Sequence, residues 1–197
     1  MSRPPVRIGV LLSGRGSNFL ALHEAIAQAT QTESAPPVEI ATVISNRPSA
    51  QGIITAEELG YDTTVFSAKN FPHREAYDQA VVDYLTQQSV ELVVLAGYNR
   101  IVTPVFINAF RDRVLNIHPS LLPAYGGVGM VGHAVHEAVI AANETESGCT
   151  VHIVTEEVDA GPILDQSRVP VLSNDTADTL AARVLAQEHS LYSKTIF

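Results

Sequence analysis

The stretch Val6-Arg7-Ile8-Gly9-Val10-Leu11-Leu12-Ser13-Gly14-Arg15-Gly16-Ser17-Asn18 decides the fold class. Residues 6–12 form an almost continuous apolar run, which is typical of a strand buried on both faces. A loop with two glycines follows, and residues 18–29 then place apolar side chains along one face of a predicted helix. A buried strand, a tight glycine loop and a helix are the opening unit of a doubly wound α/β sheet.

The same alternation continues along the chain. Four further strands are predicted at residues 38–45, 63–66, 91–96 and 114–117, three helices at 50–59, 73–88 and 103–110, and a polar connection at 30–37. Near-continuous apolar strands that alternate with helices form a parallel sheet covered on both faces. We therefore predict an α/β, Rossmann-like doubly wound fold with a mostly parallel sheet.

The pattern changes in the last third of the chain. Residues 118–132 are rich in Gly and Pro and have no helical or strand period, so they predict a long loop of the kind that is often functional. Helices are then predicted at 133–142 and 176–191, the second capped by Asn174 or Asp175, and antiparallel C-terminal strands at 150–155 and 163–171, joined by a turn at 159–162. Without repeats or a linker, residues 1–197 are predicted to form a single domain.

Composition excludes several classes of protein. The 197 residues carry a formal net charge of −9, which argues against nucleic acid as a main partner. The one cysteine, Cys149, allows no intramolecular disulfide and fits a reducing compartment. Residues 1–6 lack a signal-peptide pattern, and no apolar run approaches the roughly 18 residues of a membrane span. We expect a cytoplasmic protein with no membrane partner.

The glycine loop Gly14-Arg15-Gly16-Ser17-Asn18 is a candidate phosphate site. Its glycines allow close backbone approach, and the N–H groups at a helix start favour an anion. The Gly-x-Gly-x-x-Gly spacing is missing, and Ser45-Asn46-Arg47 stands where a dinucleotide site needs an acidic residue, so a dinucleotide is disfavoured. The alternative is a merely tight turn between strand and helix.

Asn116 and His118 are the strongest candidate catalytic pair. They lie two residues apart at the end of a predicted strand, so their side chains point to the same side, at the edge where doubly wound folds bind ligands. An amide donor beside an imidazole suits acyl transfer, because the amide can hold an oxyanion and the imidazole can move a proton. Asp159 is a candidate third member, although by itself it reads as a turn aspartate that binds its own backbone.

Taken together, these stretches resemble the folate-dependent formyltransferases, and among them the glycinamide ribonucleotide (phosphoribosylglycinamide) formyltransferase family. The resemblance runs from about Val6 to Tyr192. Matching motifs occur in this order: Gly14–Asn18, Ser45–Arg47, His73–Asp78, Val93–Ile101, Leu115–Pro123, Gly148–His152, Val158–Pro162 and Gln187–His189. The loop at 124–132 is longer than in the commonest bacterial members, so the resemblance is weakest there.

The resemblance implies a role for each matching residue. Asn116, His118 and Asp159 would be catalytic. The ribose phosphate of glycinamide ribonucleotide would meet Gly14, Arg15, Gly16, Ser17, Asn18 and Glu188. The glutamate carboxylates of the folate would bind Arg74 and Arg100. Its pterin would contact Tyr98, Asn99, Ile101 and Val102.

The implied reaction transfers a formyl group from 10-formyltetrahydrofolate to the amine of glycinamide ribonucleotide, without a metal, in a monomer or a homodimer. Three alternatives remain at this point: a formyltetrahydrofolate hydrolase, a methionyl-tRNA formyltransferase, and a non-enzymatic nucleotide-binding sensor. The first two families usually carry an additional domain, and an intact Asn-x-His and Asp set disfavours the third.

Overall fold

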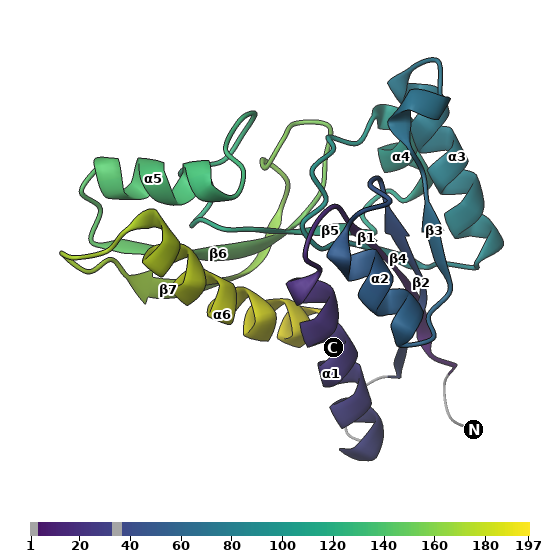
Figure 1. The fold of residues 1–197 in the computed structure, drawn as a ribbon, viewed down its shortest axis with the longest axis horizontal. Coiled ribbons are helices and arrows are strands. Elements are labelled where there is room, and N and C mark those ends of the chain that lie inside the picture. Colours follow the sequence, from purple (N-terminus) through teal and green to yellow (C-terminus); the bar gives the residue numbers. More distant parts are fainter. Residues whose placement is uncertain (1–3, 33–36) are drawn as a thin grey trace. The chain divides into compact units, whose positions relative to one another are not determined.

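The computed structural model describes residues 4–32 and 37–197, so the predicted polar connection and the N-terminal hexapeptide lie partly outside the described residues. The chain divides into two compact units, and the division falls within one strand, between Leu115 and Asn116. Unit 1 comprises the chain up to Leu115 together with Phe197, and unit 2 comprises Asn116–Ile196. Figure 1 shows the elements of both units in the colours of the sequence. That residues 1–197 act as a single domain stays a prediction.

The elements follow the predicted alternation. Unit 1 contains β1 (Val6–Leu12), α1 (Ser17–Thr32), β2 (Val38–Ser45), α2 (Gln51–Glu58), β3 (Thr63–Val65), the short 3-10 helix η1 (Ala68–Asn70), α3 (Arg74–Gln87), β4 (Leu92–Leu95) and α4 (Pro104–Ala109). The strand β5 (Val114–His118) crosses into unit 2, which continues with α5 (His133–Ala141), β6 (Glu146–Ile153), β7 (Ile163–Pro170) and α6 (Ala177–Ile196).

The strands form one seven-stranded sheet in the order β3-β2-β1-β4-β5-β6-β7. The pairs β1–β2, β1–β4 and β2–β3 are parallel, whereas β6–β7 is antiparallel. The predicted α/β fold, mostly parallel with antiparallel C-terminal strands, is therefore confirmed. The strand order reverses direction between β1 and β4, and the carboxyl ends of strands at such a switch point are where doubly wound folds bind ligands.

Helices of unit 1 pack in two pairs, α1 with α2 and α3 with α4. Right-handed crossovers place the helices of outward and returning connections on opposite faces of a parallel sheet. The sheet can therefore be apolar on both sides: Ile8, Val10, Leu11 and Leu12 of β1 are fully buried. This continuous burial explains why the apolar runs of the sequence predict these strands well.

After the end of β5, unit 2 consists of one antiparallel strand pair and two helices. The antiparallel pair β6–β7 runs from Glu146 opposite Pro170 to His152 opposite Ile163. Helix α6 packs on both strands and on α5 (Figure 1). The register of β6 shifts between Val151 and His152, so the strand is irregular where it reaches His152.

Several boundaries differ from the prediction, and the largest shift is the end of α6, which lies at Ile196 rather than at residue 191. Strand β6 begins at Glu146 rather than at residue 150, and α1 continues to Thr32, into the predicted connection. The last helix is capped by Thr176 rather than by Asn174 or Asp175, because Thr176 Oγ1 accepts the N–H of Thr179 while its carbonyl accepts that of Leu180. Side-chain capping of this kind is local and sensitive to a shift of one residue.

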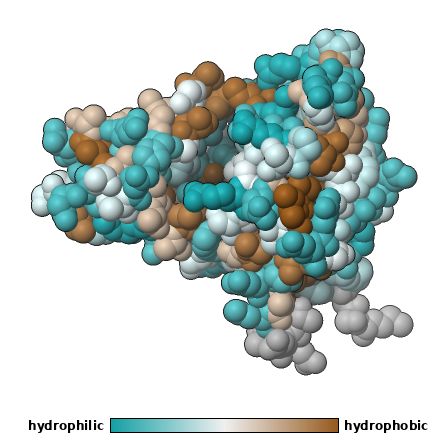
Figure 2. Space-filling view, viewed as in Figure 1, coloured by the Kyte–Doolittle hydropathy of each residue, from teal (hydrophilic) through white to brown (hydrophobic). Residues whose placement is uncertain are grey.

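One face of the molecule is drawn by residue hydropathy in Figure 2. Figure 2 shows hydrophilic residues over much of the viewed face, with hydrophobic groups scattered between them. Within residues 4–32 and 37–197, no helix is long and apolar enough to cross a membrane. The same part of the chain holds no cluster of three or more His, Cys, Asp or Glu side chains arranged for a metal ion.

Candidate active site

The glycine loop of unit 1 connects β1 to the start of α1. Gly16 has φ +78°, a left-handed conformation, and its carbonyl accepts the N–H of Leu20 in the first turn of α1. A Cβ at Gly16 would lie 2.5 Å from Cα of Gly52 in α2. The loop is held from the same side by the Gly52 N–H, which donates to the Gly14 carbonyl over 3.0 Å. Gly16 is therefore required by the fold as well as suited to a ligand.

Replacing Gly16 by alanine should destabilise the protein, whereas Gly14→Ala should not. The left-handed backbone alone costs a side chain about 1–2 kcal/mol, and the contact with Gly52 adds to it. A Cβ at Gly14 meets nothing within 4 Å, so its effect should stay within about 0.5 kcal/mol. Urea unfolding of the two variants measures the difference, and equal midpoints would contradict this account of the loop.

Three polar residues tie together the carboxyl ends of β1, β2 and β4. Ser13 Oγ donates to Asn46 Oδ1 over 2.6 Å, and the Asn46 amide donates to Asn99 Oδ1 over 2.9 Å. The Asn99 N–H closes the ring by donating to Ser13 Oγ over 2.9 Å. The predicted ligand residue Asn99 thus holds its own segment against the glycine loop. Ser13 and Asn46 had been missed, although a polar residue directly after an apolar strand was a usable signal.

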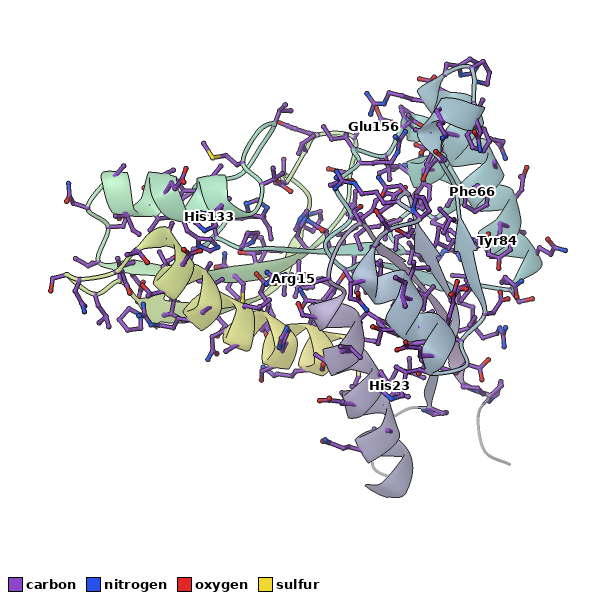
Figure 3. The ribbon with its side chains drawn as sticks, viewed as in Figure 1. Arg15, His23, Phe66, Tyr84, His133 and Glu156 are labelled. Atoms are coloured by element: carbon purple, nitrogen blue, oxygen red, sulfur yellow. The ribbon has the colours of Figure 1, made fainter. Side chains whose placement is uncertain are left out.

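Arg100, one of the two predicted carboxylate ligands, lies on an aromatic platform in unit 1. Its guanidinium carbon is 3.9 Å from the ring centre of Tyr77, whose hydroxyl is 2.9 Å from that of Tyr98. The ring of Phe66 packs edge-on against the ring of Tyr77 and also against that of Tyr84. Phe66 and Tyr84 are labelled in Figure 3. Burial raises the pKa of Tyr77 and of Tyr98, so both phenols stay neutral.

The same segment contains the other predicted carboxylate ligand. Arg74, at the start of α3, donates to the Ile101 carbonyl over 2.7 Å, so the structure brings Arg74 to the 98–102 segment. The Nε atom of Arg100 is buried and has no hydrogen-bond partner within the described residues. A buried donor without a partner costs free energy, which an incoming acceptor such as a carboxylate would recover.

The three predicted catalytic residues lie together in unit 2. Asn116 and His118 project from the same side of β5, and Asp159 lies in the turn between β6 and β7. His118 Nδ1 is 3.5 Å from Asp159 Oδ2. Side chains of His118 and Asp159 are only 5% and 11% exposed, so their interaction is weakly screened by solvent.

Hydrogen bonding fixes which nitrogen of His118 faces Asp159. Its Nε2 lies 2.8 Å from the carbonyl oxygen of Tyr125, which can only accept, so Nε2 carries a proton. The remaining nitrogen, Nδ1, is bare in the neutral ring and turns its lone pair toward the carboxylate. The Nδ1 edge of His118 and the Asp159 carboxylate therefore face each other, an arrangement that suits proton transfer between an imidazole and a carboxylate.

The turn and the long loop hold Asp159 in place. Its backbone has φ +57°, and Oδ2 accepts the Gly127 N–H over 3.0 Å. A Cβ at Gly126 would lie 3.2 Å from Cβ of Asp159, so the loop passes close to the turn. Residues 124–127 thus contact both catalytic side chains, His118 through Tyr125 and Asp159 through Gly127.

His152 is a fourth polar residue of the cluster, and its place in it was not predicted. It lies on β6 with only 2% of its side chain exposed, within 3.1 Å of the Asn116 amide nitrogen and 3.6 Å of Asp159 Oδ1. The sequence signal that could have indicated His152 was the motif Gly148–His152, one of the stretches that match the family. The other predicted residue of unit 2, Glu188, is buried on α6, where it adds to the effect of burial in raising the pKa of Cys149 to about 12.

A model of the formyl transferase family matches residues 6–196 of the chain. The chain belongs to the formyl transferase family. Its membership is consistent with a cluster of amide, imidazole and carboxylate, because each of these groups serves transfer of an acyl carbon. The catalytic and ligand-binding roles of individual residues stay predictions.

Individual relatives of the chain have names that state one substrate within this family. The phosphoribosylglycinamide formyltransferase of Haemophilus influenzae is 40% identical over 96% of the chain and 85% of the relative. A crystal structure of the Brucella melitensis phosphoribosylglycinamide formyltransferase, 42% identical, matches with a TM-score of 0.86 over 98% of this chain and 94% of that one.

Longer proteins also contain a segment similar to this chain. The trifunctional purine biosynthetic protein adenosine-3 of Drosophila pseudoobscura pseudoobscura is 41% identical over 100% of this chain. The chain spans only 14% of the length of that relative.

Proposed function

We propose that this chain transfers the formyl group of 10-formyltetrahydrofolate to the amine of glycinamide ribonucleotide in de novo purine biosynthesis. The observation that carries the proposal is the buried His118–Asp159 pair beside Asn116, in a chain about 40% identical over nearly its whole length to phosphoribosylglycinamide formyltransferases. The substrates are two small molecules, with neither a nucleic acid nor a membrane among the partners. We further propose that it acts in the cytoplasm, as a monomer or a homodimer.

The reaction begins when the amine nitrogen attacks the formyl carbon, whose carbonyl oxygen becomes an oxyanion. The Asn116 amide stabilises this charge by a hydrogen bond, and one such donor contributes roughly 3–4 kcal/mol to lowering the barrier. A positive charge on the neighbouring His118 ring stabilises the oxyanion electrostatically. The amine then loses a proton, N10 gains one, and the bond between the formyl carbon and N10 breaks. Asp159 carries the proton from the amine toward N10 through a water. No step needs a metal.

Each ligand has its own segment in the proposal. The phosphate of the ribonucleotide binds the N–H groups of Gly14–Asn18, with Glu188 on the ribose. The folate binds the 98–102 segment, and its glutamate carboxylates meet Arg74 and Arg100. The buried Nε of Arg100, with no partner in the described residues, supports the second assignment, because a carboxylate supplies the missing acceptor.

The proposal is tested by presenting 10-formyltetrahydrofolate with one acceptor at a time: glycinamide ribonucleotide, methionyl-tRNA, or water alone. Mass spectrometry follows the formylated product, and absorbance follows release of tetrahydrofolate. Formylated ribonucleotide as the only rapid product supports the proposal. Formyl transfer to tRNA, release of formate at the same rate without an acceptor, or no reaction would each contradict it.

Arg100→Ala should weaken folate binding and leave ribonucleotide binding unchanged. A charge-assisted hydrogen bond contributes about 1.5–3 kcal/mol, which is roughly a 10- to 100-fold loss in affinity. Arg113→Ala is a matched control, because Arg113 also lies over an aromatic ring, that of Phe110, but outside the ligand segments. Calorimetry with each ligand measures both, and the effect of Arg100→Ala should shrink with a folate that lacks glutamate. A loss confined to the ribonucleotide would reverse the two assignments.

A further inference from the structure

His152 makes two hydrogen bonds through its two ring nitrogens. Nδ1 lies 3.2 Å from the carbonyl oxygen of Ile153, and Nε2 lies 3.1 Å from the amide nitrogen of Asn116. The third close group is Asp159, whose Oδ1 is 3.6 Å from Nε2, beyond hydrogen-bond distance. The ring is almost fully buried, so these contacts define its environment.

The partners fix the tautomer of His152. A backbone carbonyl can only accept, so Nδ1 carries the proton that it donates to Ile153. Nε2 is then bare and accepts, and the group that faces it is an amide NH2, which can only donate. The same logic fixes Asn116: its nitrogen is turned toward His152, because an amide oxygen there would face a lone pair.

We propose that His152 is a positioning residue for formyl transfer, which holds the Asn116 amide by one N–H and leaves the other to donate to the oxyanion. This inference rests on the proposed function for the identity of the oxyanion. Without the acceptor at Nε2, the Asn116 amide is free to rotate about its last side-chain bond and can present its oxygen to the developing negative charge. Misplacement of a catalytic group by about 1 Å can cost 10²-fold in rate.

The role requires that His152 stay neutral beside a carboxylate. Burial lowers the pKa of His152, and the charge of His118 acts in the same direction, against the Ile153 hydrogen bond and the charge of Asp159. A neutral His152 does not form an ion pair with Asp159. The carboxylate therefore remains available to His118, whose Nδ1 lies 3.5 Å away.

Two substitutions separate the two nitrogens of His152. His152→Gln keeps an acceptor near the place of Nε2, whereas His152→Asn keeps a polar group only near the place of Nδ1. His152→Asn should lower kcat about 10- to 100-fold with little change in KM for either substrate, since the Asn116 contact strengthens in the transition state. His152→Gln should recover most of the loss. An unchanged kcat in His152→Asn, or an equal loss in both variants, would overturn the proposal.

A double-mutant cycle tests whether His152 acts through Asn116. In an Asn116→Ala background the amide is absent, so adding His152→Asn should change the single-turnover rate by less than about threefold. Contacting residues that act as a unit give such non-additive losses. The same 10- to 100-fold loss in both backgrounds would mean that His152 acts elsewhere, and the positioning role would be wrong.

A measurement that needs no turnover keeps this inference separate from the proposed function. Nitrogen NMR of the unliganded protein reports which ring nitrogen of His152 carries the proton, and we expect Nδ1 protonated and Nε2 bare at neutral pH. Asn116→Ala should shift the Nε2 signal, because its donor is removed. If the wild-type chain formylated no ribonucleotide but gave this signature, the proposed function would fail and the Asn116–His152 arrangement would stand. A protonated Nε2 would overturn the inference itself.

Discussion

Asp159→Asn should lower kcat by about 10³–10⁴-fold while the protein stays folded. The substitution removes the negative charge that faces His118 Nδ1 and the base that carries the proton, and comparable changes in an orienting carboxylate have effects of this size. The side chain remains nearly isosteric, and its oxygen can still accept the Gly127 N–H. Asparagine also tolerates the left-handed backbone found at φ +57°. The loss should therefore be chemical rather than structural.

Asp112→Asn is a matched control for this prediction. Asp112 has nearly the same backbone conformation, φ +59°, but it is exposed and belongs to unit 1, whereas the catalytic residues belong to unit 2. Its kcat should be that of the wild type. Stopped-flow turnover and thermal denaturation on both variants give the comparison. Near-normal turnover in folded Asp159→Asn protein would remove Asp159 from the mechanism.

Local pattern was enough to predict the parallel part of the fold. Strands β1 and β2 are predicted at their observed bounds because most of their residues are apolar and buried, and the charged residues Arg7 and Glu39 lie only near their starts. The start of β6 was missed, since Glu146, Ser147 and Gly148 have little strand preference of their own. Their conformation comes from pairing with β7, a partner more than fifteen residues away.

The candidate site was partly predictable for the same reason. Asn116 and His118 belong to one strand, so their common side follows from the strand period. Nothing local places Asp159 beside His118, because the turn that carries it is positioned by the β6–β7 pair and by the loop at Gly127. The sequence did not predict Tyr125 as a partner of His118, because Tyr125 acts through its backbone carbonyl, which no side-chain pattern reports. It did not predict His152 as a partner of Asn116, because His152 lies on another strand.

His118→Ala should lower kcat by about 10²–10⁴-fold, the range for loss of a general acid. KM should change less, since the interaction of the imidazole grows mainly in the transition state. Alanine also removes the donor to the Tyr125 carbonyl, so part of any change could come from the loop rather than from chemistry.

Two further variants of His118 separate these effects. His118→Gln keeps a donor near the place of Nε2, so the contact with Tyr125 survives while the nitrogen that faces Asp159 is lost. His118→Asn keeps a polar group near the place of Nδ1 and loses the loop contact. If the reaction needs the imidazole edge that faces Asp159, His118→Gln is as slow as His118→Ala, although its contact with the loop remains. Steady-state kinetics with both substrates measure kcat and KM for each variant. If His118→Gln changed only KM, His118 would be a binding residue, because the contact with Tyr125 would be kept and the rate of the chemical step would be unaffected.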